Sequence, residues 1–278
     1  ALERAARAQI ADIASRTTIG LEASGSGALY LSNANTRWTS SGQLLVAVRG
    51  VGAVHIDDRA SLTTGETHVA LHAGSRGAIN IHDASAVING DLFLGFGDNP
   101  GQAQLAVADG GTITADTIRI GALSNLTGDG LVLAHVQSAG TIRPGDLSVG
   151  APTPSVLTID GDYTMLDGAA LRIDVGEAPE ARANGADQLV VSGHARLDGM
   201  LIVDLLFGAQ LANGERFDIL TAASRRGRFD ALVLPALDDG LDWRVRYRDD
   251  GAQLRVVPAP AAAALLALAA GLPSRRRR

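Results

Sequence analysis

Short segments in which apolar and polar residues alternate recur along the first half of the chain at a nearly constant spacing. The segment 27–31 reads Gly-Ala-Leu-Tyr-Leu, and its pattern returns at 52–56 and 77–81, 25 residues later each time, and more weakly at 103–107. Alternation with a period of two is the signal of a β-strand. The pattern predicts one such strand per repeat. The side chains between the apolar ones should then point outward: Tyr30, His55, Asn80 and Ala106.

Each repeat contains a second alternating apolar pair. These pairs are Leu44/Val46, Val69/Leu71, Leu92/Leu94 and Ile118/Ile120. A single repeat cannot bury its own apolar residues, but repeats stacked about 4.8 Å apart bury them against one another. The sequence therefore predicts an all-β, right-handed parallel β-helix (a β-solenoid) with repeats of about 25 residues. Glycines at the repeat boundaries are expected to supply the positive φ angles of the corners.

The second half of the chain reads as strands with longer loops. Further strand-like runs are 170–175, 188–192, 200–206, 217–221 and 232–234. The last two runs, 243–248 and 253–257, flank Asp249-Asp250-Gly251, and Asp-Gly between alternating runs signals a hairpin. We expect residues 23–150 to form the solenoid repeats, and residues 151–257 to form further rungs or a β cap.

The first residues follow a different pattern. Leu2, Ala6, Ile10 and Ile13 lie on one face of a helix, at spacings of four, four and three. A short helix over residues 1–22 would cover the open end of the solenoid, whose unpaired backbone groups invite edge pairing. A frayed leader is the alternative. Because the sequence starts at Ala1, we expect either a removed export signal or a fragment.

Charge and cysteine content exclude several classes of function. The formal net charge is −6, and the longest run of basic residues in the sequence is Arg275–Arg278. Nucleic-acid binding needs clustered basic surface, so nucleic acid is not expected as a partner. The chain contains no cysteine, which excludes disulfides, cysteine-ligated zinc and thiol catalysis.

The repeats, with the corner sequence Val-Ala-Val-Arg-Gly-Val-Gly at 46–52, resemble the short β repeats of autotransporter passenger domains and related exported proteins. The segment 140–145 followed by 157–163 resembles the part that closes such arrays, as does 187–191 followed by 214–221. The resemblance implies an exported protein at the cell surface, on the outer membrane or outside the cell. It implies nothing about the ligand.

The C-terminal segment 258–278 resembles a PEP-CTERM sorting signal. Such signals combine a short proline-containing motif, an apolar helix and a basic tail. The matching residues are Val257, Pro258 and Pro260, the apolar run 261–272, and Arg275, Arg276, Arg277 and Arg278. The resemblance implies a hydrophobic C-terminal helix, transient membrane contact and processing by a sorting peptidase, and the basic tail fits a cytoplasmic end. A disordered alanine-rich tail is the alternative.

One set of polar residues repeats with the strands. Asn33, Asp58, Asp83 and Asp109 occupy the same place, two residues after the second apolar position of each strand. Asn and Asp often close turns by bonding their own backbone. Alternatively, stacked carboxylates could form a track for Ca²⁺, which would relieve their repulsion. Asp58, Asp83 and Asp109 are thus weak metal candidates, whereas His68 and His72 are expected to be ordinary surface residues.

Two classes of function fit these patterns. The first is an exported, non-enzymatic structural or adhesive protein of the cell surface or extracellular matrix, with polysaccharide or other envelope proteins as partners. The alternative is a β-helix lyase or hydrolase acting on polysaccharide. Such enzymes need clustered acids on one face. The outward row Tyr30, His55, Asn80 and Ala106 contains no acid, and the outward arginines Arg49, Arg59, Arg76 and Arg119 are scattered. We therefore expect no catalytic residues and no cofactor.

Overall fold

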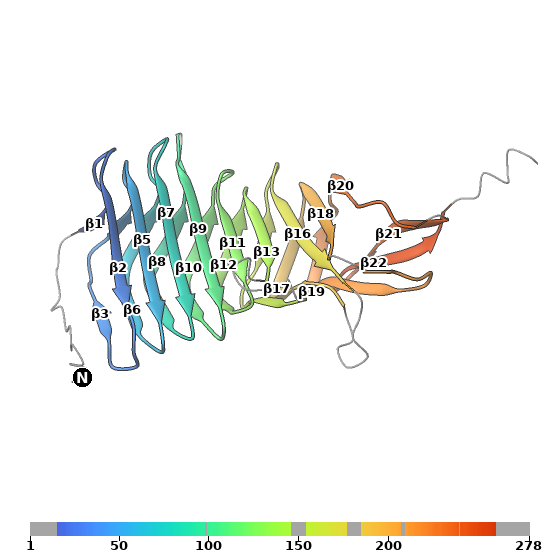
Figure 1. Ribbon diagram of the computed structural model, residues 1–278, viewed down its shortest axis with the longest axis horizontal. Coiled ribbons are helices and arrows are strands. Elements are labelled where there is room, and N and C mark those ends of the chain that lie inside the picture. The colour runs from blue at the N-terminus through green and yellow to red at the C-terminus, as the bar shows by residue number, and fades with distance from the viewer. Residues whose placement is uncertain are drawn as a thin grey trace, which may run out of the picture.

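The computed structural model consists of strands that wind into two long sheets (Figure 1). It describes residues 16–97, 99–145, 154–176, 185–206, 209–238 and 240–259. Within these residues the chain forms 22 strands and no helix. Most neighbouring strands are parallel and belong to successive turns of the chain, which confirms the predicted all-β, repeating, solenoid-like architecture.

Each turn of the chain contributes to both sheets. The nine-stranded sheet contains β2 (Ser26–Leu31), β5 (Val51–Asp57), β7 (Arg76–His82), β9 (Gln102–Ala108), β11 (Asn125–Gly128), β13 (Thr141–Pro144), β16 (Ala170–Val175), β18 (Met200–Leu205) and β20 (Ala231–Val233). The thirteen-stranded sheet contains β1 (Thr17–Ile19), β3 (Arg37–Thr39), β4 (Leu44–Val46), β6 (Ser61–Val69), β8 (Ser85–Leu94), β10 (Thr112–Ile120), β12 (Leu131–Ser138), β14 (Val156–Ile159), β15 (Tyr163–Met165), β17 (Gln188–Leu197), β19 (Arg216–Gly227), β21 (Leu241–Arg248) and β22 (Gly251–Pro258).

The core consists of columns of aliphatic side chains between the two sheets. In the nine-stranded sheet Ile81 pairs with Ile56 on one side and with Val107 on the other, and all three are fully buried. Tyr30, at an alternate position, is 71% exposed. The predicted strand positions and their inward and outward faces are therefore confirmed here. The columns are stable because each apolar residue is covered by its equivalents one rung away.

One predicted apolar pair is wrong. In β6 the residues in register with Leu44 and Val46 are Thr67 and Val69, whereas Leu71 lies beyond the strand. The register shifts between Gly65 and Thr67, so counting alternation through this irregularity gives the wrong residue. Thr67 is fully buried in the column, and its hydroxyl donates to the Gly65 carbonyl at 3.0 Å. This bond allows a hydroxyl among aliphatic neighbours.

The number of residues per turn changes after β9, but the buried residues of successive turns still pair in register. Leu105 pairs with Leu126, 21 residues on, and Leu126 pairs with Ile142 after only 16 residues. Ile142 then pairs with Leu171, 29 residues later. All four side chains are fully buried in one column. The sequence repeat fades in this region because loop length varies, while stacking still sets the position of each strand.

Glycines supply positive φ angles at the corners, as predicted, and Asn and Asp residues do so as well. The equivalent residues Asn33, Asp58, Asp83 and Asp109 have φ between 45° and 81°. Gly52 and Gly77 lie within strands and do not have positive φ. A Cβ on Gly77 would lie 2.4 Å from the Val69 side chain, so close approach between the sheets requires glycine there. These two glycines therefore allow close packing, whereas glycines such as Gly74 and Gly110 supply the positive φ angles between strands.

The two ends of the stack differ. Residues 17–19 form β1, which pairs with β4, so the predicted helix over 1–22 is wrong for this part. The β-branched residues Thr17, Thr18 and Ile19 favour a strand where a neighbour supplies hydrogen bonds. Residues 1–15 lie outside the described residues. At the other end β22 pairs antiparallel with both β19 and β21, and the predicted hairpin at Asp249-Asp250-Gly251 is confirmed.

The predicted C-terminal helix begins beyond Ala259 and lies outside the described residues. In the part of the chain that the structure describes, no helix is long and apolar enough to cross a membrane.

Candidate functional site

A row of large polar and aromatic side chains crosses the outer face of the thirteen-stranded sheet. His68 of β6, Phe93 of β8, Arg119 of β10 and Gln137 of β12 are in register on four consecutive turns. Because residues in register on parallel strands point to the same face, these four side chains form one line across the strands. We call this row, with its neighbours Gln43, Glu66, Asp91 and Phe96, the outer strip.

Aromatic contacts hold the middle of the outer strip. The His68 ring stacks on Phe93, with centroids 4.6 Å apart and planes 10° from parallel. The Arg119 guanidinium carbon lies 5.9 Å from the centre of the same ring, a cation–π distance. Phe96 follows in the next loop, 6.0 Å from Phe93, and is 45% exposed. Phe96 therefore presents the accessible aromatic surface of the outer strip.

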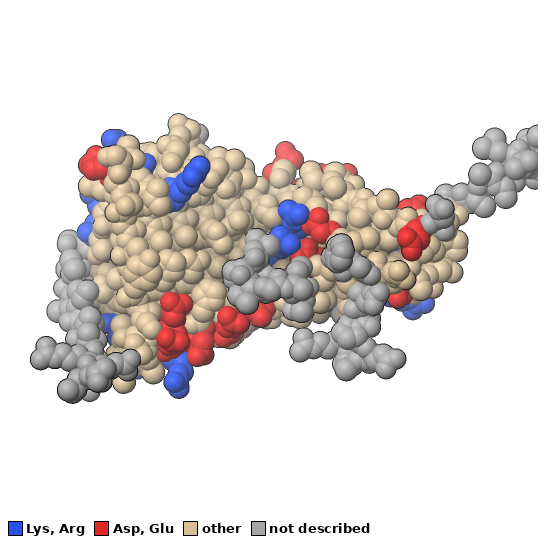
Figure 2. All heavy atoms as spheres, in the orientation of Figure 1, with Lys and Arg blue, Asp and Glu red and all other residues tan. Residues whose placement is uncertain are grey.

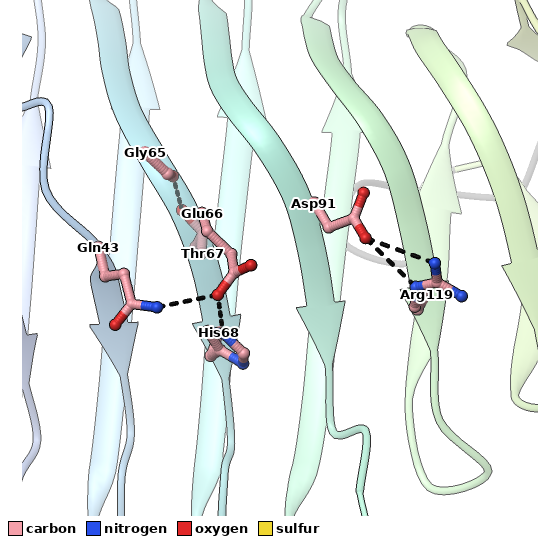
Figure 3. A network of polar contacts seen from close by, with 7 residues as sticks. All are labelled: Gln43, Gly65, Glu66, Thr67, His68, Asp91 and Arg119. Carbon is pink, nitrogen blue, oxygen red and sulfur yellow. Dashed lines mark hydrogen bonds and ion pairs between the residues drawn. The ribbon is translucent and has the colours of Figure 1, made fainter.

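Both carboxylates of the outer strip are paired (Figure 3). Glu66 accepts a hydrogen bond from the Gln43 amide at 2.9 Å and lies 2.8 Å from the His68 ring nitrogen. The hydrogen bond to His68 lowers the pKa of Glu66. Asp91 forms an ion pair with Arg119 at 3.4 Å, and Arg119 also donates to Gln137 at 2.8 Å. The two acids are thus fixed as hydrogen-bond acceptors on neighbouring turns.

This arrangement suits the recognition of a hydroxyl-rich chain. The amides, carboxylates and guanidinium offer donors and acceptors for hydroxyl groups, and Phe96 offers a surface for apolar packing. The rungs repeat at about 4.8 Å, so equivalent polar groups recur along the line. A glycosidase acid, in contrast, needs a raised pKa. The hydrogen bond to His68, which lowers the pKa of Glu66, disfavours this role for Glu66.

The sequence prediction missed the outer strip. It examined the outward positions of the other sheet and treated Arg119 as isolated. Phe93 and Arg119 were detectable as equivalent positions between the apolar pairs 92/94 and 118/120. In β6 the equivalent pair is Thr67 and Val69, and the polar Thr67 hid the position of His68 between them. A correct register would have shown an imidazole, a phenyl ring and a guanidinium on adjacent turns.

The predicted Asn and Asp ladder stands at the corners that follow the strands of the nine-stranded sheet. Asp58 accepts a hydrogen bond from the Ser32 hydroxyl at 2.8 Å, and Asp109 lies 3.4 Å from the His82 ring nitrogen. Acidic residues line the corresponding edge in Figure 2, below a broad uncharged face. Within the described residues, no three His, Asp or Glu side chains gather as metal ligands. The positive φ angles match a turn-forming role for this ladder.

A second polar cluster lies on the later turns. The His194 ring nitrogen Nδ1 is 2.6 Å from the Ser224 hydroxyl, beside a hollow of about 310 Å³ that Arg196 and Arg226 help to line. Asp162 accepts a hydrogen bond from the His194 backbone N–H at 2.7 Å. In a serine–histidine–aspartate relay the carboxylate bonds the imidazole, which orients it as a base. Here the carboxylate bonds the backbone, so the geometry of this cluster does not reproduce that relay.

A third cluster contains a buried carboxyl group beside the nine-stranded sheet. Asp187 is 1% exposed and accepts backbone hydrogen bonds from Ser155 at 2.9 Å and Asp174 at 3.0 Å. Asp174 in turn forms an ion pair with Arg143 at 2.7 Å. Burial raises the pKa of Asp187 to about 7, although the two hydrogen bonds lower it. The cluster links β13, β16 and the approach to β17, which is a structural role.

The residues of the predicted sorting signal are only partly described. Val257 and Pro258 belong to β22, where they pair with Asp242 and Leu241 of β21. Proline fits there because it is the last residue of the strand. Pro260 and Arg275–Arg278 lie outside the described residues.

No protein-family model matches the sequence, and no curated protein matches it.

Proposed function

We propose that the protein is an exported, non-enzymatic structural or adhesive protein that binds polysaccharide through the outer strip. The observation that supports this most is the registered row of His68, Phe93 and Arg119, whose flanking acids are already paired. Paired acids keep fixed orientations, which favours recognition of a chain over acid–base chemistry. The long stack of parallel turns provides a rigid support for such a row.

The proposal includes the hand of the coil, its export and its processing. We propose a right-handed coil, because crossover connections between parallel strands have this hand in nearly all proteins. In Figure 1 the strands of the nine-stranded sheet run downward at the front while the chain advances from left to right, which agrees with this hand.

The resemblance to passenger repeats and to a sorting signal supports export and cleavage after residue 257. Mass spectrometry of surface protein from the native host tests cleavage, and an intact C-terminal Arg278 would contradict it.

Affinity gel electrophoresis tests polysaccharide binding. The full chain is run through gels containing hydroxyethylcellulose, galactomannan or dextran. We expect retardation by at least one polymer, and we expect Phe96→Ala to weaken it about three- to tenfold, the loss of one aromatic contact. The matched control is Tyr30→Ala, which removes an exposed ring from the other sheet. No retardation by any of the three, or equal loss in both variants, would contradict the outer strip as the site.

A reducing-end assay on the same polymers tests the alternative enzyme. The proposal predicts no turnover by the full chain. Turnover that Ser224→Ala abolishes would instead assign catalysis to the cluster of His194 and Ser224, whose hydrogen bond is the feature that favours an enzyme.

A further inference from the structure

The antiparallel end of the thirteen-stranded sheet concentrates arginine on its outer face. Eight of the 24 arginines in the chain lie between residues 216 and 255. Arg255 of β22 stands directly opposite Arg216 of β19 and directly opposite Arg244 of β21. Residues paired in this way share a face, so three guanidinium groups lie side by side across three strands. Figure 1 shows these strands at the end of the stack remote from the N-terminus.

This arrangement is unfavourable for the protein alone. Like charges directly opposite one another in a sheet are destabilising. The pKa of Arg255 is lowered, mainly because its guanidinium group is partly desolvated. The positive charges of Arg216, Arg246 and Arg244 lower it further. The inward faces of the same strands hold Phe217, Trp243 and Leu254, which are buried. The apolar face therefore stabilises this end, whereas the row of Arg216, Arg255 and Arg244 opposes its folding.

Few of these arginines are neutralised. Arg248 forms ion pairs with Asp218 at 3.0 Å and with Asp250 at 3.2 Å, and Arg255 donates to the Gln253 amide at 2.8 Å. Within the described residues, Arg244 and Arg246 have no carboxylate partner within 4.0 Å. Both are exposed. The positive charge of this face therefore remains available to a ligand.

The arginines surround a hollow of about 430 Å³. Arg228, Arg244, Arg246 and Arg255 line it together with Tyr247, Val245 and Val257, and no described acidic residue lines it. Tyr247 is fixed in place, since the guanidinium groups of Arg225 and Arg228 lie 5.3 and 5.4 Å from its ring centre. The lining of the hollow thus combines four arginines with one aromatic and two aliphatic residues.

We propose that this hollow, the arginine hollow, binds carboxylate groups of an acidic polysaccharide. A guanidinium matches the two oxygens of a carboxylate with two parallel hydrogen bonds. Val257, which alternates in phase with Arg255 on the same strand, offers apolar surface to a sugar ring. A duplex nucleic acid would extend past the hollow onto Asp242, Asp249 and Asp250 of a chain with net charge −6, whereas a flexible polymer can contact the hollow alone. The site is separate from the outer strip and does not depend on the function proposed for it.

Isothermal titration of the full chain with polygalacturonate tests the proposal. Fully methyl-esterified polygalacturonate is the matched ligand, because it keeps the sugar backbone and removes the charge. At low ionic strength we expect binding of the acid form only, and we expect 0.5 M NaCl to abolish it. Arg244→Gln and Arg255→Gln should each weaken binding about tenfold, the loss of one charged hydrogen-bonding group. Arg37→Gln, an exposed arginine of β3, is the control and should bind normally.

The same variants separate a binding role from a structural one. Arg244→Gln should raise the midpoint of thermal unfolding of the free protein while it weakens binding, because it relieves repulsion. Equal binding of polygalacturonate and its methyl ester would overturn the proposal, and so would an unchanged affinity in both Arg244→Gln and Arg255→Gln. Tighter binding of a 20-base-pair DNA than of polygalacturonate would overturn the choice of ligand. Phe96→Ala should leave polygalacturonate binding unchanged, so failure of the outer strip is distinguishable from failure of the arginine hollow.

Discussion

At the scale of single residues, the core of the stack holds a polar group that has no partner. Tyr163 of β15 is fully buried between Val136 and Ala195, and its hydroxyl has no hydrogen-bond partner within the described residues. Burial raises the pKa of this phenol. An unsatisfied buried hydroxyl is destabilising.

Replacing Tyr163 by phenylalanine should therefore stabilise the protein. We expect Tyr163→Phe to increase the free energy of unfolding by about 1 kcal/mol, because it removes a group that lost its water without gaining a partner. Urea unfolding followed by circular dichroism measures the change. Tyr247→Phe is the control and should act in the opposite direction, since the Tyr247 hydroxyl accepts the Phe229 N–H at 3.3 Å. A loss of stability in Tyr163→Phe would contradict the unsatisfied state of the hydroxyl.

Asp187 should make stability depend on pH between about 4 and 7. Burial raises its folded pKa from 3.8 to about 7, with Asp174 raising it further and Arg143 lowering it. The folded protein therefore holds the proton more tightly than the unfolded chain. The resulting stabilisation is fully present below the unfolded pKa and is lost as pH rises through the folded pKa.

The variant Asp187→Asn keeps the shape of the protonated acid and cannot ionise. We expect the unfolding midpoint of the wild type to fall relative to that of Asp187→Asn as pH rises from 4 to 8. Differential scanning calorimetry across this range measures the difference. Gln102→Ala, at an exposed position of β9, changes no ionisable group and should show a constant difference from the wild type. A constant difference for Asp187→Asn as well would mean that Asp187 is ionised throughout.

At the scale of elements, each strand is positioned by its neighbours one turn away, and its own alternation decides which face is inside. Val54, Ile79 and Leu105 form one column, and Ile56, Ile81 and Val107 form another, all fully buried. A truncated column residue leaves a cavity, so its partners one turn above and below lose their contacts with it. The columns are too narrow for neighbouring side chains to move in and fill the cavity.

Truncation of a column residue should therefore be costly, whereas truncation of its outward neighbour should not. We expect Ile81→Ala to reduce the free energy of unfolding by about 2–5 kcal/mol. Asn80→Ala, one residue away and pointing outward, should change it by less than about 0.5 kcal/mol. Chemical denaturation of both variants measures the contrast. Equal destabilisation would show that the strand register is wrong.

At the scale of the whole molecule, the stack needs protection at its ends. The hairpin of β21 and β22 covers the edge of β19 in the thirteen-stranded sheet. Leu254 is fully buried in this hairpin, opposite Phe217 and Val245, and Trp243 packs 6.3 Å from Phe217. An uncovered edge strand would offer its backbone to a second chain.

Detaching the hairpin should thus produce oligomers without unfolding the turns. We expect Leu254→Asp to place a charge in the apolar face, at a cost of several kcal/mol, and so to release the hairpin. In a Trp38→Phe background Trp243 is the only tryptophan, and its emission should shift to longer wavelength. Light scattering should show larger species at a nearly unchanged β-sheet circular dichroism signal. Monomers with a red-shifted Trp243 would show that the hairpin does not protect the edge.

For the first four turns, the sequence alone determined the strands of the nine-stranded sheet, their repeat and their inward faces, because alternation is local and these turns have nearly equal length. It also determined the hairpin, since Asp249-Asp250-Gly251 can be read without knowledge of its neighbours. The tertiary structure alone decided the register beyond β9, where turns of 16 to 29 residues conceal the stacking.

The candidate sites were decided by tertiary structure for the same reason. Glu66 meets Gln43 across 23 residues, and Arg119 meets Asp91 across 28. Arg216, Arg255 and Arg244 meet only because β22 lies between β19 and β21. A side chain's outward direction follows from alternation along its own strand. Its partner across the sheet depends on irregularities, loop lengths and strand order, which no local pattern records.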